Sequence, residues 1–302
     1  MSATQKCIII LSAKSSGSSA LQNLLTSARD IQKVESTRHY ENETLYWTKA
    51  ASVLGRKQVE MLDSEVPIPA ERARRELVEF LGENVPEFKA PQNDEALVFG
   101  GWDALNARYA PIFLEKSPHH LLQWSCLELI AEAMQRRPDI EYLVIGLIRN
   151  PMDVIYSAWS RWRIYPRLKQ YEWRSEYENL LKAQSLFGSN LVMLRYEDMV
   201  SQPDSLKPIL RFIGAEDQLA RIRESYLHKR SVAKWRQDKK FSFHLDPEVV
   251  ALAEQFGYQP EEFEHDNANG LWEPYQQVTR VRYRAWVPLR DTLRKIKYAV
   301  MS

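Results

Sequence analysis

Short apolar runs alternate with segments of helical spacing along most of the chain. Cys7–Leu11 and Tyr142–Ile148 are continuous apolar runs of the length expected for strands buried in a parallel sheet, and Asn190–Leu194 is the last clear strand of the chain. Ala96–Phe99 and Pro111–Leu114 are shorter candidate strands. Because strands that alternate with helices pair in parallel, the pattern predicts an α/β fold with a central, mainly parallel sheet flanked by helices.

Helical periodicity predicts the elements between and after these strands. We expect helices over Ala70–Gly82, Leu121–Arg137 (ended by Pro138), Ser205–Gly214, Asp217–Leu227 and Asp246–Phe256. A further helix follows Asn150, which can cap it, with Pro151 at its first position and Asp153 where a capping-box acid would stand. No repeat or linker divides the chain, so we expect one domain over residues 1–302, with residues 259–302 as a C-terminal extension packed on it.

The turn after the first strand is crowded with small polar residues. It contains Lys14, Gly17 and the serines Ser12, Ser15, Ser16, Ser18 and Ser19. Main-chain N–H groups of such a loop can point into one concavity, and the N-terminus of the following helix adds partial positive charge. The serine hydroxyls and the Lys14 ammonium add further donors, so the segment predicts a site for a phosphate or sulfate group. A plain strand-to-helix turn is the alternative.

The loop matches neither of the two common nucleotide-binding patterns. ATP- and GTP-hydrolysing proteins typically carry G-x-x-x-x-G-K-[ST], but Gly17 is the only glycine of this loop and Ser18 follows it. The dinucleotide pattern G-x-G-x-x-G is missing as well. The anion would therefore be bound by a loop of another kind.

Composition places the chain among ordinary globular proteins. It has 302 residues, 44% hydrophobic and 27% charged, and its 41 basic and 40 acidic residues leave a formal charge of +1. Without a basic excess, nothing argues for nucleic acid as a partner. Both cysteines, Cys7 and Cys126, stand in apolar context, which favours a reducing compartment over a disulfide framework. No secretory signal or membrane-spanning run is visible, so we expect a cytoplasmic protein.

Polar residues also follow two other predicted strands. Lys116, His119 and His120 come after one, and Arg149 comes after another. Open α/β sheets bind ligands at the carboxyl ends of their strands, and a guanidinium with a hydroxyl nearby, here Ser157 two helical turns on, suits a phosphate. An exposed turn and a plain ion pair are the alternatives. Adjacent histidines point apart and no third ligand is at useful spacing, so we expect no metal site.

Three segments combine aromatic with charged residues. Residues 35–47 carry five ionisable groups beside Tyr46 and Trp47, which suits either a cleft wall or a solvated loop. Trp159–Trp173 interleaves basic and aromatic residues, as a wall for a sugar or an anionic ring-bearing acceptor would, or as a helix with aromatic core contacts would. Trp286–Val300 is basic and amphipathic; it could lie on a membrane surface, but we expect it to pack on the domain.

Four separate segments resemble the sulfotransferase family, enzymes that use 3′-phosphoadenosine 5′-phosphosulfate (PAPS). LSAKSSGSSALQNLL is similar to the family's 5′-phosphosulfate loop, and LIRNPMDVIYSAWSRW to its 3′-phosphate segment, with Arg149 and Ser157 in the matching places. LRYEDM, which contains Tyr196, and SVAKWRQD, which contains Lys234 and Trp235, resemble the two signatures that follow. The resemblance covers about residues 6–238 and implies a P-loop-type fold of three layers.

The chain departs from the family pattern at two places. Ser15 stands where the family commonly has the basic residue of the loop, and Lys14 is one position earlier. His228, Lys229 and Arg230 replace an Arg-Lys-Gly segment, which makes Lys229 and Arg230 the candidates for contact with the 3′-phosphate there.

Two more segments resemble the heparan-type glycan sulfotransferases. Residues 40–47, YENETLYW, are similar to their E-N-E-x-h-F-F stretch, whose second glutamate is the catalytic base and falls on Glu43. Residues 115–118, EKSP, are similar to E-K-T-P, whose lysine contacts the sulfuryl group and falls on Lys116. The branch that acts on small molecules uses a histidine two residues after a lysine. Here Pro118 holds that position and His119 follows, so His119 is a second candidate base.

The resemblance implies transfer of a sulfuryl group from PAPS to a hydroxyl or amine, with release of 3′-phosphoadenosine 5′-phosphate (PAP). Lys14, Ser15, Ser16, Gly17, Ser18 and Ser19 would bind the 5′-phosphosulfate, and Arg149 with Ser157 the 3′-phosphate. We expect a carbohydrate or glycosylated lipid as acceptor, with a small alcohol or phenol and a histidine base as the alternative. A small-molecule kinase and a nucleotide- or glycan-binding module without turnover are the rival functions.

Overall fold

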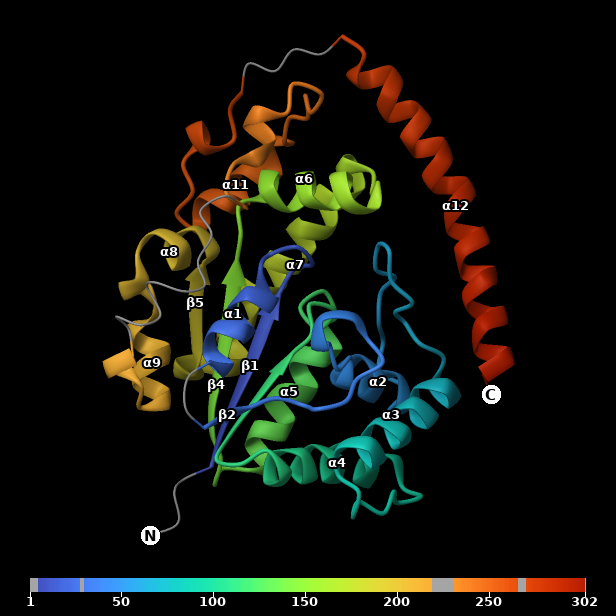
Figure 1. Cartoon of the computed structure of the whole chain (residues 1–302), viewed down its shortest axis with the longest axis vertical. Coiled ribbons are helices and arrows are strands. Elements are labelled where there is room, and N and C mark those ends of the chain that lie inside the picture. The colour runs from blue at the N-terminus through green and yellow to red at the C-terminus, as the bar shows by residue number, and fades with distance from the viewer. Residues whose placement is uncertain (1–4, 28–29, 219–230, 266–269, 302) are drawn as a thin grey trace. The chain divides into compact units, whose positions relative to one another are not determined.

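The computed structural model describes residues 5–27, 30–218, 231–265 and 270–301 (Figure 1). The chain divides into two compact units. The first comprises residues 1–59, 66–149 and 176–229, and the second comprises residues 60–65, 150–175 and 230–302. We describe each unit by itself.

A sheet of five parallel strands forms the centre of the first unit. The strands are β1 (Lys6–Ser12), β2 (Ile31–Gln32), β3 (Ile112–Lys116), β4 (Glu141–Ile148) and β5 (Leu191–Arg195), in the spatial order β2-β3-β1-β4-β5. In the register of the sheet, Ile8 of β1 lies beside Leu114 on one side and Leu143 on the other. The run Cys7–Leu11 has no exposed surface, as its continuous apolar sequence requires of a strand with neighbours on both faces. The predicted central, parallel α/β sheet is confirmed.

Seven whole α-helices and the second half of α7 (Pro166–Phe187), from residue 176 on, belong to the described part of the first unit. The seven are α1 (Ser18–Thr26), α2 (Tyr46–Val53), α3 (Ala70–Asn84), α4 (Asp94–Arg108), α5 (Trp124–Arg136), α8 (Tyr196–Ser201) and α9 (Lys207–Ile213). Four short 3-10 segments accompany them: η1 (Tyr40–Asn42), η2 (Gly188–Asn190), η3 (Pro203–Leu206) and η4 (Glu216–Gln218).

Aromatic side chains join α2 and α4 to the sheet. The rings of Trp47 and Trp102 lie 4.7 Å apart, and Trp102 lies 5.5 Å from Phe113 of β3. Tyr46 completes the cluster at 5.1 Å from Trp47. Each such pair is worth about 0.5–1.5 kcal/mol beyond the burial of its area. The cluster therefore fixes the helix that begins just after Glu43 against the strand that ends at Lys116.

The second unit consists of helices. It contains α6 (Pro151–Trp162), η6 (Lys234–Gln237), α11 (Pro247–Gln255), η7 (Pro260–Glu262) and α12 (Trp272–Met301), together with the first half of α7 (Pro166–Phe187). Its core includes Trp159, whose ring lies 5.2 Å from Phe241 and 5.6 Å from Trp272. Among the helices that the structure describes, none has both the length and the hydropathy that crossing a membrane requires.

Most predicted elements are present, but Ala96–Phe99 is not a strand. It lies inside helix α4, where the Asn93 side chain caps the N-terminus by accepting a hydrogen bond from the Ala96 N–H at 2.8 Å. The helix buries residues on most of its circumference, so its sequence has no amphipathic period to distinguish it from a strand. The helix predicted from Leu121 begins later, at Trp124, and most of Asp217–Leu227 lies outside the described residues.

Asn150 caps α6 as predicted, but Asp153 has a contact that the sequence did not indicate. The Asn150 side chain accepts a hydrogen bond from the Met152 N–H at 2.9 Å, and Pro151 occupies the first turn. Asp153 Oδ2 accepts a hydrogen bond at 3.1 Å from the N–H of Ala233, which ties the segment before η6 to this helix.

Candidate functional site

The sheet order brings the predicted site segments to one edge. Because β1 lies between β3 and β4, the serine-rich loop that follows β1 lies between the carboxyl ends of those two strands. Lys116 ends β3 and Arg149 follows β4, so one basic residue stands on each side of the loop. This edge is where open α/β sheets bind their ligands.

The loop itself has a backbone that favours small residues. Gly17 has φ +89° and Ser15 has φ +71°, both in the left-handed region. A methyl group on Gly17 would overlap the ring of Tyr196, which packs directly against the loop. The Ser15 hydroxyl is buried and has no hydrogen-bond partner in the described structure. A buried hydroxyl in this state is suited to donate to an anion bound in the loop.

Tyr177 fixes the loop from helix α7, and the sequence carried no local signal for it. Its hydroxyl donates to the Leu147 carbonyl at 3.0 Å, so the Ser16 hydroxyl, also at 3.0 Å, donates to the tyrosine oxygen. Burial raises the pKa of Tyr177 well above its usual value, which keeps this phenol protonated. The loop is therefore connected to β4 by a chain of two buried hydrogen bonds.

Arg149 contacts the same loop from the other side. Its Nη1 donates to the Ser15 carbonyl at 2.9 Å, and its guanidinium lies 4.5 Å from the centre of the Tyr196 ring. The side chain is largely buried, with 8% of its residue surface exposed. Two segments more than 130 positions apart in the sequence thus meet, as a single ligand that bridges them would require.

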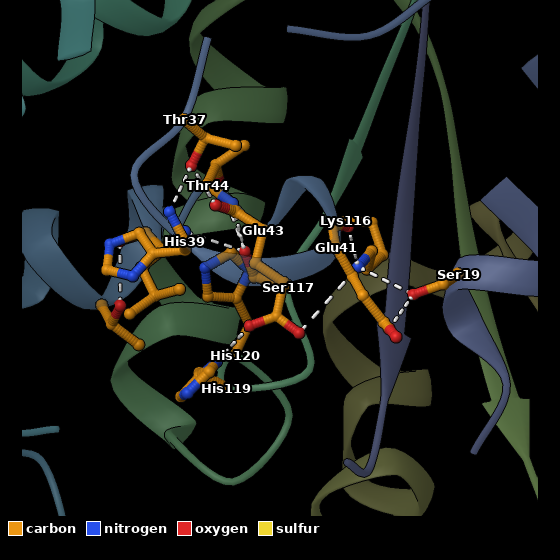
Figure 2. Close-up of polar contacts among 12 residues, drawn as sticks. Ser19, Thr37, His39, Glu41, Glu43, Thr44, Lys116, Ser117, His119 and His120 are labelled. Atoms are coloured by element: carbon orange, nitrogen blue, oxygen red, sulfur yellow. Dashed lines mark hydrogen bonds and ion pairs between the residues drawn. The ribbon is translucent and has the colours of Figure 1, made fainter. Parts of the chain in front are cut away.

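A second cluster surrounds Lys116 on the opposite side of the loop (Figure 2). Lys116 Nζ donates to the Glu41 carbonyl at 2.7 Å and to the Ser19 hydroxyl at 3.3 Å, and it lies 3.9 Å from Glu43 Oε1. The Ser19 hydroxyl in turn donates to Glu41 Oε2 at 2.5 Å. The Lys116 side chain is fully buried, so its ammonium is directed at these groups and not at bulk water.

The Glu43 carboxylate faces both Lys116 and His119. His119 Nδ1 lies 3.5 Å from Glu43 Oε2, and both side chains are mostly buried. Burial raises the pKa of Glu43 above its ordinary value, although the charges of Lys116 and Lys14 act in the opposite direction. Burial also holds the pKa of His119 well below 6.5, with Lys14 adding to the effect, so the imidazole is neutral at physiological pH. The pair thus combines a basic carboxylate with a neutral ring.

The segment that carries Glu43 is attached to the end of β3 by side chains that the sequence reading did not assign. Ser117 Oγ accepts hydrogen bonds from the N–H groups of Thr44 at 3.0 Å and Leu45 at 2.9 Å. Thr44 Oγ1 donates to Glu115 Oε1 at 2.5 Å, and the Trp47 N–H donates to His120 Nε2 at 3.3 Å. Glu115 and Ser117 flank Lys116 in the EKSP segment, and their position in that motif is the feature of the sequence that could have pointed to them.

The remaining predicted residues belong to the second unit or lie outside the description. Ser157 is on α6, and Lys234 and Trp235 are on η6. The indole of Trp235 is buried with its ring centre 5.4 Å from that of His265. Lys229 and Arg230 lie outside the described residues.

Comparison with known proteins gives a family. A solved structure described as a sulfotransferase from Alicyclobacillus acidocaldarius is similar at 15% sequence identity and a TM-score of 0.44, over 83% of this chain and 91% of that one. No curated protein sequence matches. The family model described as "Sulfotransferase family" matches residues 7–218, well over half of the 302 residues. The match includes the serine-rich loop, Lys116 and Arg149, and this chain therefore belongs to the sulfotransferase family.

Proposed function

We propose that this sulfotransferase moves the sulfuryl group of PAPS to a hydroxyl or amine of a carbohydrate or glycosylated lipid, with Glu43 as the base. The observation that carries the proposal is that residues from the ends of β3 and β4 both contact the loop that follows β1. Arg149 contacts Ser15 on one side of it, and Lys116 contacts Ser19 on the other. A donor with a 3′-phosphate and a 5′-phosphosulfate needs cationic groups at two separate places, and the chain provides them.

The donor would be bound by the loop and Arg149. In this proposal the N–H groups of residues 15–19, the Lys14 ammonium and the serine hydroxyls hold the 5′-phosphosulfate. Arg149 and Ser157 hold the 3′-phosphate, a group that ATP lacks, and Tyr196, Lys234 and Trp235 border the nucleotide. The buried and unpartnered Ser15 hydroxyl supports this assignment, because an anionic oxygen would satisfy it.

The transfer step would be in line. The acceptor oxygen or nitrogen forms a bond to sulfur as the bond from sulfur to the bridging phosphate oxygen breaks, and PAP leaves with the electron pair. Glu43 takes the proton of the acceptor. Lys116 stabilises the charge that develops on the sulfuryl and bridging oxygens, as positioned cations do in phosphoryl transfer. The short distances among Ser19, Lys116 and Glu43 support these roles, since the three groups must reach one sulfur atom.

The alternative base is His119. Its ring is neutral and lies 3.5 Å from Glu43, so it could accept the acceptor's proton, as the histidine of the small-molecule branch does. Burial that lowers the pKa of an imidazole makes it a weaker base, whereas burial makes the Glu43 carboxylate a stronger one. This comparison favours Glu43.

The test is an assay of PAP release from PAPS with a panel of glycans, glycolipids and small alcohols. Glu43→Gln should lower kcat by about a hundredfold or more while PAP binding stays unchanged, because a general base is worth about that much. Arg149→Ala should weaken PAP binding, measured by calorimetry. Glu35→Gln, a change at an exposed carboxylate, is the matched control.

Each outcome separates the candidate functions. Full activity in Glu43→Gln with loss in His119→Ala would transfer the base role to His119. Binding of PAP without turnover on any acceptor would favour a module that only binds nucleotide. Turnover of ATP, with no binding of PAP, would favour the kinase.

A further inference from the structure

Helix α12 carries an exposed apolar stripe that its own unit leaves uncovered. Tyr275, Val278, Trp286, Leu289 and Leu293 are 42–55% exposed. At 100° per residue these five positions fall within an arc of about 80°, so they form one continuous face. Such a face on a helix needs a partner, because contiguous exposed apolar surface marks an interaction site.

Among the described side chains of α12, those that are buried lie in its first turns. Trp272 packs at 5.3 Å from Phe241 and 5.6 Å from Trp159, and Gln276 and Thr279 are also buried. From Arg280 to Leu293, every side chain that the structure describes is exposed. The stripe thus begins in the second unit and continues along a helix that its own unit does not cover.

The charge of α12 indicates which kind of partner its apolar stripe would contact. Between residues 280 and 297 the sequence has seven basic residues, namely Arg280, Arg282, Arg284, Arg290, Arg294, Lys295 and Lys297, and one acidic residue, Asp291. Arg280 and Arg284 are exposed on the side of the helix away from the stripe. Arg282 lies within the arc, where a long aliphatic stem can accompany an apolar face while its guanidinium reaches lipid headgroups.

We infer that α12 binds the surface of membranes that contain anionic lipids. Tryptophan, tyrosine and leucine on one face with arginine on the other is the pattern of a helix that lies in the membrane interface. Basic groups next to the surface add attraction to anionic headgroups. A second copy of the chain fits less well, because the segment from residue 280 to residue 297 has seven basic residues and one acidic residue, and two such segments repel each other.

The inference is tested by flotation of the full chain with vesicles. The chain should float with vesicles of phosphatidylcholine and phosphatidylglycerol, less so as salt is raised, and not with vesicles of phosphatidylcholine alone. The double variant Leu289→Glu, Leu293→Glu should lower the bound fraction about tenfold or more, because it places charges in the apolar face. Arg280→Gln with Arg284→Gln should weaken binding to the anionic vesicles.

Val59→Glu is the matched control, since Val59 is 47% exposed outside α12, and it should bind like the unchanged chain. Failure of the unchanged chain to float would overturn the inference, as would binding that the stripe variant retains. Two other results apply if the unchanged chain does not bind vesicles. A lower mass of the stripe variant than of the unchanged chain, measured by light scattering, would assign the stripe to contact with a second copy. A lower melting temperature of the stripe variant would assign the stripe to packing within the chain. None of these readouts depends on sulfate transfer, so they stand apart from the proposed function.

Discussion

Burial determines the protonation of the side chains that converge at Glu43. For Glu43, His119 and Lys116 alike, the largest cause of the pKa shift is loss of contact with water, and neighbouring charges modify it. In each case burial favours the neutral form, which raises the pKa of the acid and lowers the pKa of the two bases. Glu43 and Lys116 then limit each other's shift, because each favours the charged form of its neighbour.

These shifts predict a bell-shaped pH dependence of kcat/KM. As the proposed base, Glu43 must be ionised to accept a proton, so the rate should rise with pH through a midpoint above the ordinary value of 4.5. In its proposed role Lys116 must be protonated, so the rate should fall again at a pH below the ordinary lysine value of 10.5. Steady-state measurements across pH check both limbs, and Lys116→Arg should move the alkaline limb upwards. An acid limb that is unchanged in Glu43→Gln and lost in His119→Ala would contradict the assignment.

Gly17 is a residue at which one added methyl group should weaken the proposed donor site. Gly17→Ala places a side chain in the left-handed region and against the Tyr196 ring, and strain of this kind costs about 1–3 kcal/mol. We expect PAP affinity, measured by calorimetry, to fall at least tenfold. Gly55→Ala is the control, because Gly55 also has positive φ but open space around it. If both changes have the same effect on affinity, the loop has no special role.

At the scale of elements, the N-terminus of α2 is the feature that positions the proposed base. Leu45, at the N-cap, has no side chain that could accept a hydrogen bond from the first turn. Instead, the Leu45 N–H donates to Ser117 and the Trp47 N–H donates to His120, and both acceptors belong to the segment after β3. Glu41, Asn42 and Leu45 all have positive φ, which non-glycine residues rarely adopt. Tertiary hydrogen bonds therefore hold this segment in a conformation that its local sequence does not favour.

Ser117→Ala should misplace Glu43 without affecting the donor. Two buried N–H groups would lose their acceptor, which costs about 1–3 kcal/mol for each unsatisfied group. We expect a lower melting temperature and a lower kcat, with PAP affinity unchanged and the acid limb of the pH profile displaced. Ser117→Thr should keep the melting temperature and kcat close to those of the unchanged chain, because threonine retains the hydroxyl that accepts the two hydrogen bonds. Ser125→Ala, at a buried serine of α5 whose hydroxyl has no hydrogen-bond partner among the described residues, should leave kcat unchanged.

Elements that the sequence predicted well are those whose own residues determine them. The run Cys7–Leu11 and the capped start of α6 carry their information locally, and both are confirmed. The local sequence of helix α4 does not determine it in this way. Gly100 and Gly101 lower its helix propensity, and its apolar residues are distributed around the whole circumference of the helix. Strand β2, of two residues, is too short for any periodicity and depends on pairing with β3.

For the whole molecule, the sequence indicated where the site segments lie but not how they are supported. The motif residues Lys116 and Arg149 were found because they stand at strand ends, and the sheet order brings them to one loop. Tyr177 was not found, because it lies in α7 and contacts Ser16 across 161 positions. Contacts of that range depend on the packing of the fold, which no local pattern encodes.

Binding of the donor product should stabilise the fold as a whole. A ligand that binds only the native state adds about 2.7 kcal/mol at a concentration one hundred times its Kd. We expect PAP to raise the melting temperature in proportion to the logarithm of its concentration, and AMP, which lacks the 3′-phosphate, to do so far less. Thermal denaturation monitored by fluorescence measures both. Equal shifts with the two nucleotides would contradict the proposed contact of Arg149 with the 3′-phosphate.

The buried position of Cys7 and Cys126 has a consequence for how the protein meets oxidants. They are the two cysteines of the sequence, both are free thiols, and burial raises the pKa of each well above its usual value. Since the thiolate is the form that reacts with peroxide or with alkylating agents, we expect both thiols to react slowly in the folded state. Oxidants that act on thiols should therefore have little effect on the proposed transfer reaction.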